Sequence, residues 1–212
     1  MKMQNKFFSF ILMVTLFSLA SHQQATAQSG RSGIKGGLNI SNLYLDNVND
    51  QNARLGFNIG VFGQLFSSET FALQVELLYS TKGSTAQYNS GSLYQEISYN
   101  LNYLDMPVLA VFKLGEVAEV HLGGYASYLL NANISYQGNL ANGADQIDKD
   151  NLKSFDYGIS GGLGANFGKV QVGARYNFGL VKIANSNGAR SVIGDAKNSC
   201  AQVFIAFALN SK

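Results

Sequence analysis

The segment SFDYGISGGLGANFGKVQVGARYNFGL, Ser154–Leu180, decides the fold because its residues alternate in character. Gly168 and Lys169, near its centre, predict a tight turn between two strands. Side chains alternate in direction along a strand, so the segment is a predicted β-hairpin with one apolar face and one polar, glycine-rich face. The apolar face carries Phe155, Tyr157, Ile159, Leu163, Ala165, Phe167, Val170, Val172, Ala174, Tyr176 and Phe178.

Similar alternation elsewhere predicts six more strands. We expect these strands at about 34–41, 54–66, 71–82, 95–114, 119–133 and 199–209. Short turns are expected at 67–70, 115–118 and 168–169, and longer polar loops at 44–53, 83–94, 135–151 and 184–198. Short turns on one side and long loops on the other are typical of outer-membrane barrels. Within the fourth strand, Pro107 cannot donate a ladder hydrogen bond, so we expect a bulge or irregular register near it.

The composition favours a barrel in a membrane over one in water. Charged residues make up 13% of the chain, whereas soluble domains carry roughly 25%. The polar faces hold mainly Gly, Ser, Asn and Gln, which suit the lumen of an eight-stranded barrel that side chains fill. A soluble barrel of the lipocalin or streptavidin type is the alternative, with its apolar face inside. We expect an all-β fold, an eight-stranded antiparallel up-and-down transmembrane β-barrel.

The first residues resemble a signal peptide. Lys2 and Lys6 precede an apolar run at Phe7–Ala20, and Ala25-Thr26-Ala27 is a small-x-small cleavage site. An uncleaved anchor is the alternative, although the apolar run is short for a membrane-spanning helix. We therefore expect a signal peptide at 1–27, an outer-membrane β-barrel domain at 28–212, and a location in the cell outer membrane.

Six charged residues lie on polar faces and are expected to pair within the lumen, because unpaired buried charges are costly. They are Lys35, Arg54, Glu76, Lys82, Asp156 and Arg175. For Arg175 the expected partner is Glu76 first and Asp156 second. His121 is the one candidate catalytic base of the mature chain, and we expect it to be a hydrogen-bonded lumen residue instead. Cys200 is the single cysteine, and no cofactor, metal site or catalytic residue is expected.

Five segments resemble the PorT-family outer-membrane β-barrel proteins. They are GIKGGLNISNL at Gly33–Leu43, LQVELLYSTKG at Leu73–Gly83, YLDMPVLAVFKL at Tyr103–Leu114, FDYGISGGLGANF at Phe155–Phe167 and RYNFGL at Arg175–Leu180. The resemblance spans the mature chain and implies an outer-membrane barrel of a Gram-negative bacterium. The founding member of that family is associated with protein secretion to the cell surface. Outer-membrane barrels commonly end on an aromatic residue, whereas here Phe207 is the nearest one to the end.

These features together predict a non-enzymatic barrel with a side-chain-filled lumen. It would serve as an envelope scaffold, or as an accessory of secretion or surface interaction through its long loops. A small transport channel and a lipid-modifying outer-membrane enzyme are the alternatives. The expected partners are outer-membrane lipid, the barrel-assembly machinery and an envelope or surface protein. A formal net charge of +2 without a basic stripe gives no sign of nucleic-acid binding, and a monomer is expected.

Overall fold

The computed structural model describes residues 30–44, 52–90, 93–147, 151–188, 190 and 194–210. The expected signal peptide and its cleavage site lie outside these residues. Nine strands are described, and they are β1 (Ser32–Tyr44), β2 (Asn52–Ser67), β3 (Phe71–Ser90), β4 (Leu93–Leu114), β5 (Ala118–Gly138), β6 (Gly143–Gln146), β7 (Phe155–Phe167), β8 (Val170–Lys182) and β9 (Lys197–Asn210).

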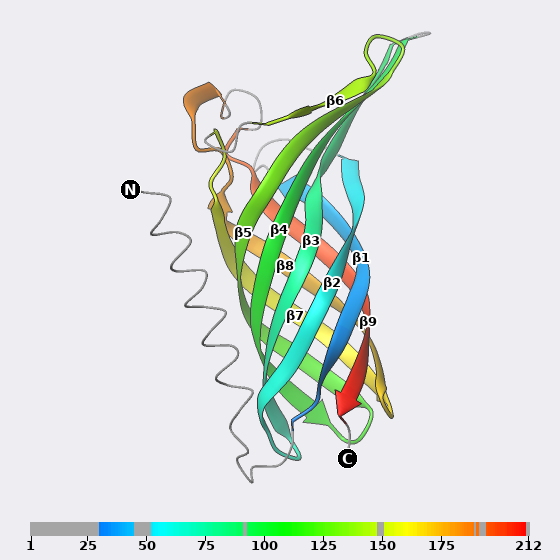
Figure 1. Cartoon of the computed structure of the whole chain (residues 1–212), viewed down its shortest axis with the longest axis vertical. Helices are drawn as coiled ribbons and strands as arrows, with labels where there is room; N and C mark the ends of the chain where they lie inside the picture. The colour runs from blue at the N-terminus through cyan, green and yellow to red at the C-terminus, as the bar shows by residue number, and fades with distance from the viewer. Residues whose placement is uncertain are drawn as a thin grey trace.

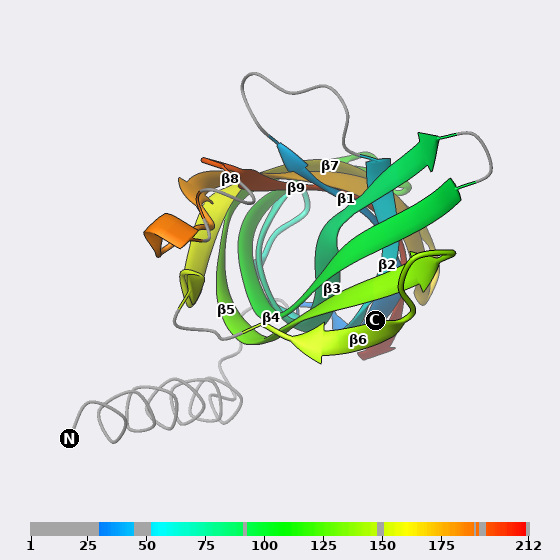
Figure 2. The same ribbon diagram turned by 90° about the horizontal axis from the view of Figure 1, so that it is seen from above.

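Eight of these strands form a closed antiparallel barrel, which confirms the expected fold. Each strand pairs with the next along the chain, except that β5 pairs with β7. β1 and β9 pair from Ser32 to Tyr44 and close the ring, which Figure 2 shows from above. The additional strand, β6, pairs only with the end of β5.

The two ends of the barrel differ in how the strands are connected. Ser68–Thr70, Gly115–Val117 and Gly168-Lys169 join strands at one end, called here the short-turn end. Gly168 has a φ of 63°, a left-handed conformation that glycine adopts without steric cost. The other connections lie at the opposite end, called here the long-loop end.

The outward face is apolar and exposed, as the alternation predicts. Leu163 and Ile205, for example, are 63% and 61% exposed. The inward face is polar and buried, as on β3, where Gln74, Glu76 and Ser80 are at most 1% exposed. This arrangement is the inverse of a soluble barrel and suits a lipid environment.

Two expected polar loops are strand in the structure. β3 and β4 remain paired up to Ser90 and Leu93, so most of the expected loop 83–94 is a β-ladder. β5 continues to Gly138, and β6 adds to its edge within the expected loop 135–151. Figure 1 shows β3, β4 and β5 continuing past the barrel with β6 beside them. We call this part the protruding sheet; it comprises residues 86–90 of β3, which lie beyond the last pairing with β2, residues 93–97 of β4, residues 133–138 of β5, and β6.

The expected irregularity near Pro107 is a gap in one ladder, without a shift of register at the proline. Met106 and Pro107 have no partner on β3, and the β3–β4 register is the same on both sides of this gap. On the other side, Pro107 pairs with Tyr125 in continuous register, and the register shift with β5 lies between Asn102 and Tyr103. Asn102 faces Asn131 whereas Tyr103 faces Leu129, so the extra residue lies in β5.

Candidate functional site: the barrel lumen

The lumen holds three layers of ionisable residues, of which the central one contains two basic side chains and one acid. Glu76 accepts two hydrogen bonds from Arg175, at 2.7 and 2.8 Å. It also accepts hydrogen bonds from Lys35 Nζ at 3.0 Å to each of its oxygens, and one from Gln74 at 2.8 Å. The ring of Phe204 lies 3.7 Å from Lys35 Nζ and 5.4 Å from the Arg175 guanidinium. We call Lys35, Glu76 and Arg175 the central ion cluster.

The central ion cluster combines two basic side chains with one carboxylate. All three side chains are almost fully buried. The face of an aromatic ring attracts cations, so Phe204 provides part of the stabilisation that a second carboxylate would otherwise give. The structure thus places Arg175 on Glu76, the partner expected first, and adds Lys35 to the same carboxylate.

A second layer lies nearer the long-loop end. Lys82 Nζ donates to Asp105 Oδ1 at 2.9 Å. Asp156 Oδ2 accepts hydrogen bonds from Asn198 at 2.8 Å and from the Tyr125 hydroxyl at 3.2 Å. The side chain of Tyr125 approaches β7 and β8 closely, since a Cβ added at Gly158 would lie 2.7 Å from its ring. Glycine on the lumen face therefore makes room for large side chains.

A third layer lies near the short-turn end. Glu119 accepts hydrogen bonds from Asn166 and Gln171, each at 2.7 Å, and its Oε2 lies 3.2 Å from His121 Nε2. The Arg31 guanidinium donates to Asn166 Oδ1. His121 is fully buried and its ring stacks with Phe204 at 6.3 Å between centroids. This environment suits the expected hydrogen-bonded lumen histidine.

Uncharged amides and hydroxyls lie between the central and second layers. Asn39 donates to Ser80 at 2.9 Å and accepts from Asn58 at 2.7 Å and from Gln202 at 3.0 Å. All four side chains are buried. Buried polar groups that satisfy one another rigidify a core, so the middle of the lumen is a connected polar network.

Apolar residues close the long-loop end of the lumen. Strand residues and the segments before β7 and between β8 and β9 pack into one cluster, which we call the apolar plug. Its buried members are Leu43, Leu101, Tyr103, Leu129, Ala132, Leu152, Ile183, Ala184 and Ala196. Backbone hydrogen bonds hold these segments together, including Ile183 N to Ala196 O at 2.8 Å and Leu129 N to Ser154 O at 2.8 Å.

The apolar plug includes part of β4. Leu101 and Tyr103 alternate with polar neighbours like the lipid-facing residues of other strands, yet they are buried inside the barrel at 2% and 0% exposure. Their outward neighbour Asn102 is hydrogen-bonded to Asn131 on β5. Apolar side chains therefore enter the lumen beside Lys82, which lies across from Leu101, whereas the outer surface of β4 and β5 is polar at Asn102 and Asn131.

Five of the six charged residues expected in the lumen are buried there. Arg54 is instead half-buried, and its Nη1 donates to the backbone oxygen of Lys82 at 3.5 Å. Within the part of the chain that the structure describes, Arg54 forms no ion pair. The sequence reasoning missed two lumen acids, Asp105 and Glu119, of which Glu119 shares its parity with His121.

The described residues show neither a metal site nor a helical membrane span. No group of three or more His, Cys, Asp or Glu residues among them is arranged to hold a metal ion. None of the helices in the described ranges combines the length and apolar character needed to cross a membrane.

Comparisons with known proteins identify the family. A search of curated proteins found no match. One similar solved structure is that of Ail, the attachment invasion locus protein of Yersinia pestis, in complex with the heparin analogue sucrose octasulfate. It aligns with 14% sequence identity and a TM-score of 0.48, over 86% of this chain and 100% of Ail. Neisserial surface protein A aligns at 12% identity and a TM-score of 0.44, over 86% of this chain and 99% of that protein.

The family model described as "Outer membrane protein beta-barrel domain" matches residues 24–185. In such barrels the short turns are periplasmic and the longer connections extracellular. The short-turn end of this protein is therefore periplasmic and its long-loop end extracellular. The chain belongs to the outer membrane protein beta-barrel domain family and resides in the outer membrane.

Proposed function

We propose that the protein is a non-enzymatic outer-membrane barrel that interacts with an envelope or surface protein through its protruding sheet. It would act as a scaffold or as an accessory of secretion, and the segments that resemble the PorT family support the secretion role. The observation that carries the proposal is the protruding sheet itself. The protruding sheet is not needed to close the barrel. Its residues lie beyond the lipid-facing part of the strands, at a level where the outer surface is polar.

The chemistry of the protruding sheet suits contact with a protein. Its described side chains are largely amides, hydroxyls and tyrosines, and residues Gly143–Gln146 of β6 are exposed. β6 is the last strand of its sheet, so its outer backbone groups can pair with an added strand.

The lumen supports an interaction role over transport. Three layers of ionisable side chains point into it, and the apolar plug packs at its long-loop end. An eight-stranded barrel has an interior just wide enough for side chains to fill. A steady water-filled path would require several buried ion pairs to separate.

Photo-crosslinking in whole cells tests the proposal. A photoreactive residue in place of Gln87, Gln137 or Asp145, all exposed on the protruding sheet, is expected to capture a defined protein. The matched control is the same residue at Lys169, which is exposed at the periplasmic end. Shortening the β3–β4 hairpin by removing residues 86–96 should abolish capture at Gln137 while the barrel still folds. Unchanged capture in the shortened protein would argue against the sheet as the contact surface.

A further inference from the structure

Four basic residues gather at the extracellular ends of β7, β8 and β9. Lys182 ends β8 and lies directly across from Lys197 at the start of β9. The backbone nitrogen of Lys153 donates to the oxygen of Ile183 at 2.8 Å, which places Lys153 beside the end of β8. Arg190 belongs to the segment between β8 and β9. We call Lys153, Lys182, Arg190 and Lys197 the basic patch.

One carboxylate lies within the basic patch. Asp195 accepts a hydrogen bond from Lys182 Nζ at 2.6 Å, and both side chains are about half exposed, at 56% and 49%. This hydrogen bond, with the positive charges of Lys182, Arg190 and Lys153, lowers the pKa of Asp195 below its usual value. Several cations thus converge on a single acid, so most of the positive charge has no counterpart among the described residues nearby.

The opposition of Lys182 and Lys197 is unfavourable in the protein alone. Like charges directly across a strand pair destabilise a sheet. Asp195 offsets the charge of Lys182, but one carboxylate leaves Lys153, Arg190 and Lys197 to repel one another. An anion from outside the chain would remove this repulsion.

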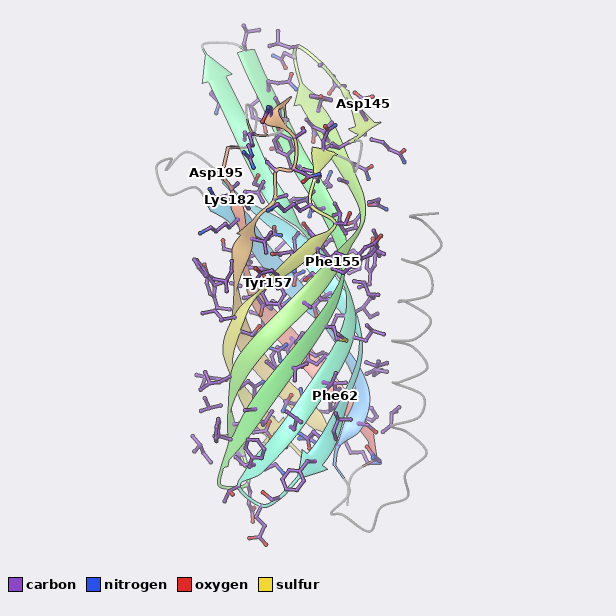
Figure 3. The ribbon with its side chains drawn as sticks, turned by 90° about the vertical axis from the view of Figure 1, so that its left-hand side faces the viewer. Phe62, Asp145, Phe155, Tyr157, Lys182 and Asp195 are labelled. Carbon is purple, nitrogen blue, oxygen red and sulfur yellow. The ribbon has the colours of Figure 1, made fainter. Side chains whose placement is uncertain are left out.

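The basic patch lies at the upper border of the lipid-facing belt. Lys182 follows Tyr176 and Leu180 on the outward face of β8, where they are 50% and 47% exposed. On β7, Phe155 and Tyr157 are 62% and 58% exposed. Figure 3 shows Lys182 and Asp195 above these two aromatic residues. Tyrosine is enriched where the membrane meets water, so the basic patch lies at the level of lipid head groups.

We propose that the basic patch binds a phosphate group of an outer-leaflet lipid, whose acyl chains lie along Phe155, Tyr157 and Leu180. Lysine and arginine are the usual partners of phosphate. The apolar belt directly beneath the basic patch selects a phosphate attached to acyl chains over a free one. This site is independent of the protein contact proposed for the protruding sheet.

Titration of the purified full-length barrel in a neutral detergent tests this proposal. The probes are bisphosphorylated lipid A, the same lipid without phosphates, and inorganic phosphate. A basic residue near an anionic surface contributes about fivefold in affinity, so Lys182→Gln with Lys197→Gln should weaken binding of lipid A about 25-fold. Lys169→Gln removes a charge at the opposite end and should leave the affinity unchanged. Heat-modifiable mobility on gels checks that each variant folds.

A variant that should strengthen the binding of lipid A completes the test. Asp195→Asn removes the competing carboxylate and should tighten the binding of lipid A by about fivefold. Equal affinities of the wild type, the double variant and Asp195→Asn would overturn the proposal. Equally tight binding of phosphate-free lipid A would also overturn it, and so would inorganic phosphate binding as tightly as lipid A.

Discussion

Arg175 and Glu76 lie 99 positions apart in the chain, yet two hydrogen bonds of 2.7 and 2.8 Å join the guanidinium to the carboxylate across the lumen. Lys35 binds the same carboxylate at 3.0 Å. Glu76 is therefore the one acid that two buried cations of the central ion cluster share.

Because two cations share Glu76, truncating Glu76 and truncating Arg175 should lower the free energy of unfolding by different amounts. Glu76→Ala leaves Lys35 and Arg175 unmatched, and loss of one buried partner typically costs about 3–5 kcal/mol. Arg175→Ala should cost less, because Lys35 still neutralises Glu76. The double variant should be less destabilised than the sum of the single variants. The measurement is urea unfolding in lipid vesicles followed by circular dichroism, since the chain contains no tryptophan. If the two single variants lost equal free energy of unfolding and the double variant lost their sum, Glu76 would not be shared by the two cations.

Alternation along single strands predicted much of this architecture. In the hairpin, the parity of Leu163, Val172 and Arg175 assigned the correct face to each residue. The same reasoning placed Lys35 and Glu76 in the lumen from two further strands. The face of a residue depends only on its position along its own strand, so it can be assigned without knowing which strands are neighbours.

The missed features depend on contacts between distant segments. Leu101 and Tyr103 face inward because loops from the other side of the barrel form the apolar plug around them, and no local pattern shows this. The polar residues 83–90 read as a loop, yet each pairs across the β3–β4 ladder. Asp105 lies two residues before Pro107, where the alternation of β4 breaks, so parity alone assigns it no face.

Arginine on the lipid-facing surface should destabilise the barrel according to its depth. Leu163 pairs with Ala174, whereas Val172 pairs with Ala165, so Leu163 lies two residues farther from the periplasmic turn. Arginine costs about 2–4 kcal/mol at the bilayer midplane and about 0–1 kcal/mol near the interface. Leu163→Arg should therefore cost more than Val172→Arg in vesicle unfolding, with Leu163→Ala as the control. Near-normal folding of both arginine variants would argue against the lipid-facing assignment.

Processing of the N-terminus is a separate prediction from the sequence. Ala25-Thr26-Ala27 predicts cleavage before Gln28. Mass spectrometry of the protein from the outer-membrane fraction should give a chain that begins at Gln28. An intact Met1–Ala27 segment in that fraction would refute export by this route.

The wild-type barrel should show no steady conductance. The three charged layers and the apolar plug should leave no continuous water path, so purified protein in a planar bilayer should give no stable single-channel steps. A conducting outer-membrane porin serves as the positive control. Large, stable steps from the wild type would favour the transport channel over the interaction role.

Cys200 provides an independent probe of the same closed lumen. It is the only cysteine in the chain, it is 1% exposed, and it lies on the inward face of β9 between Asn198 and Gln202. Thiol reagents attack accessible thiolates, so a small charged methanethiosulfonate should label the folded barrel far more slowly than the urea-unfolded chain. Cysteine introduced in place of Lys169, together with Cys200→Ala, should react quickly in the folded state and so controls for reagent access. Rapid labelling of Cys200 in the folded protein would show that water and ions reach the middle of the lumen, and it would contradict both the plugged lumen and the absence of conductance.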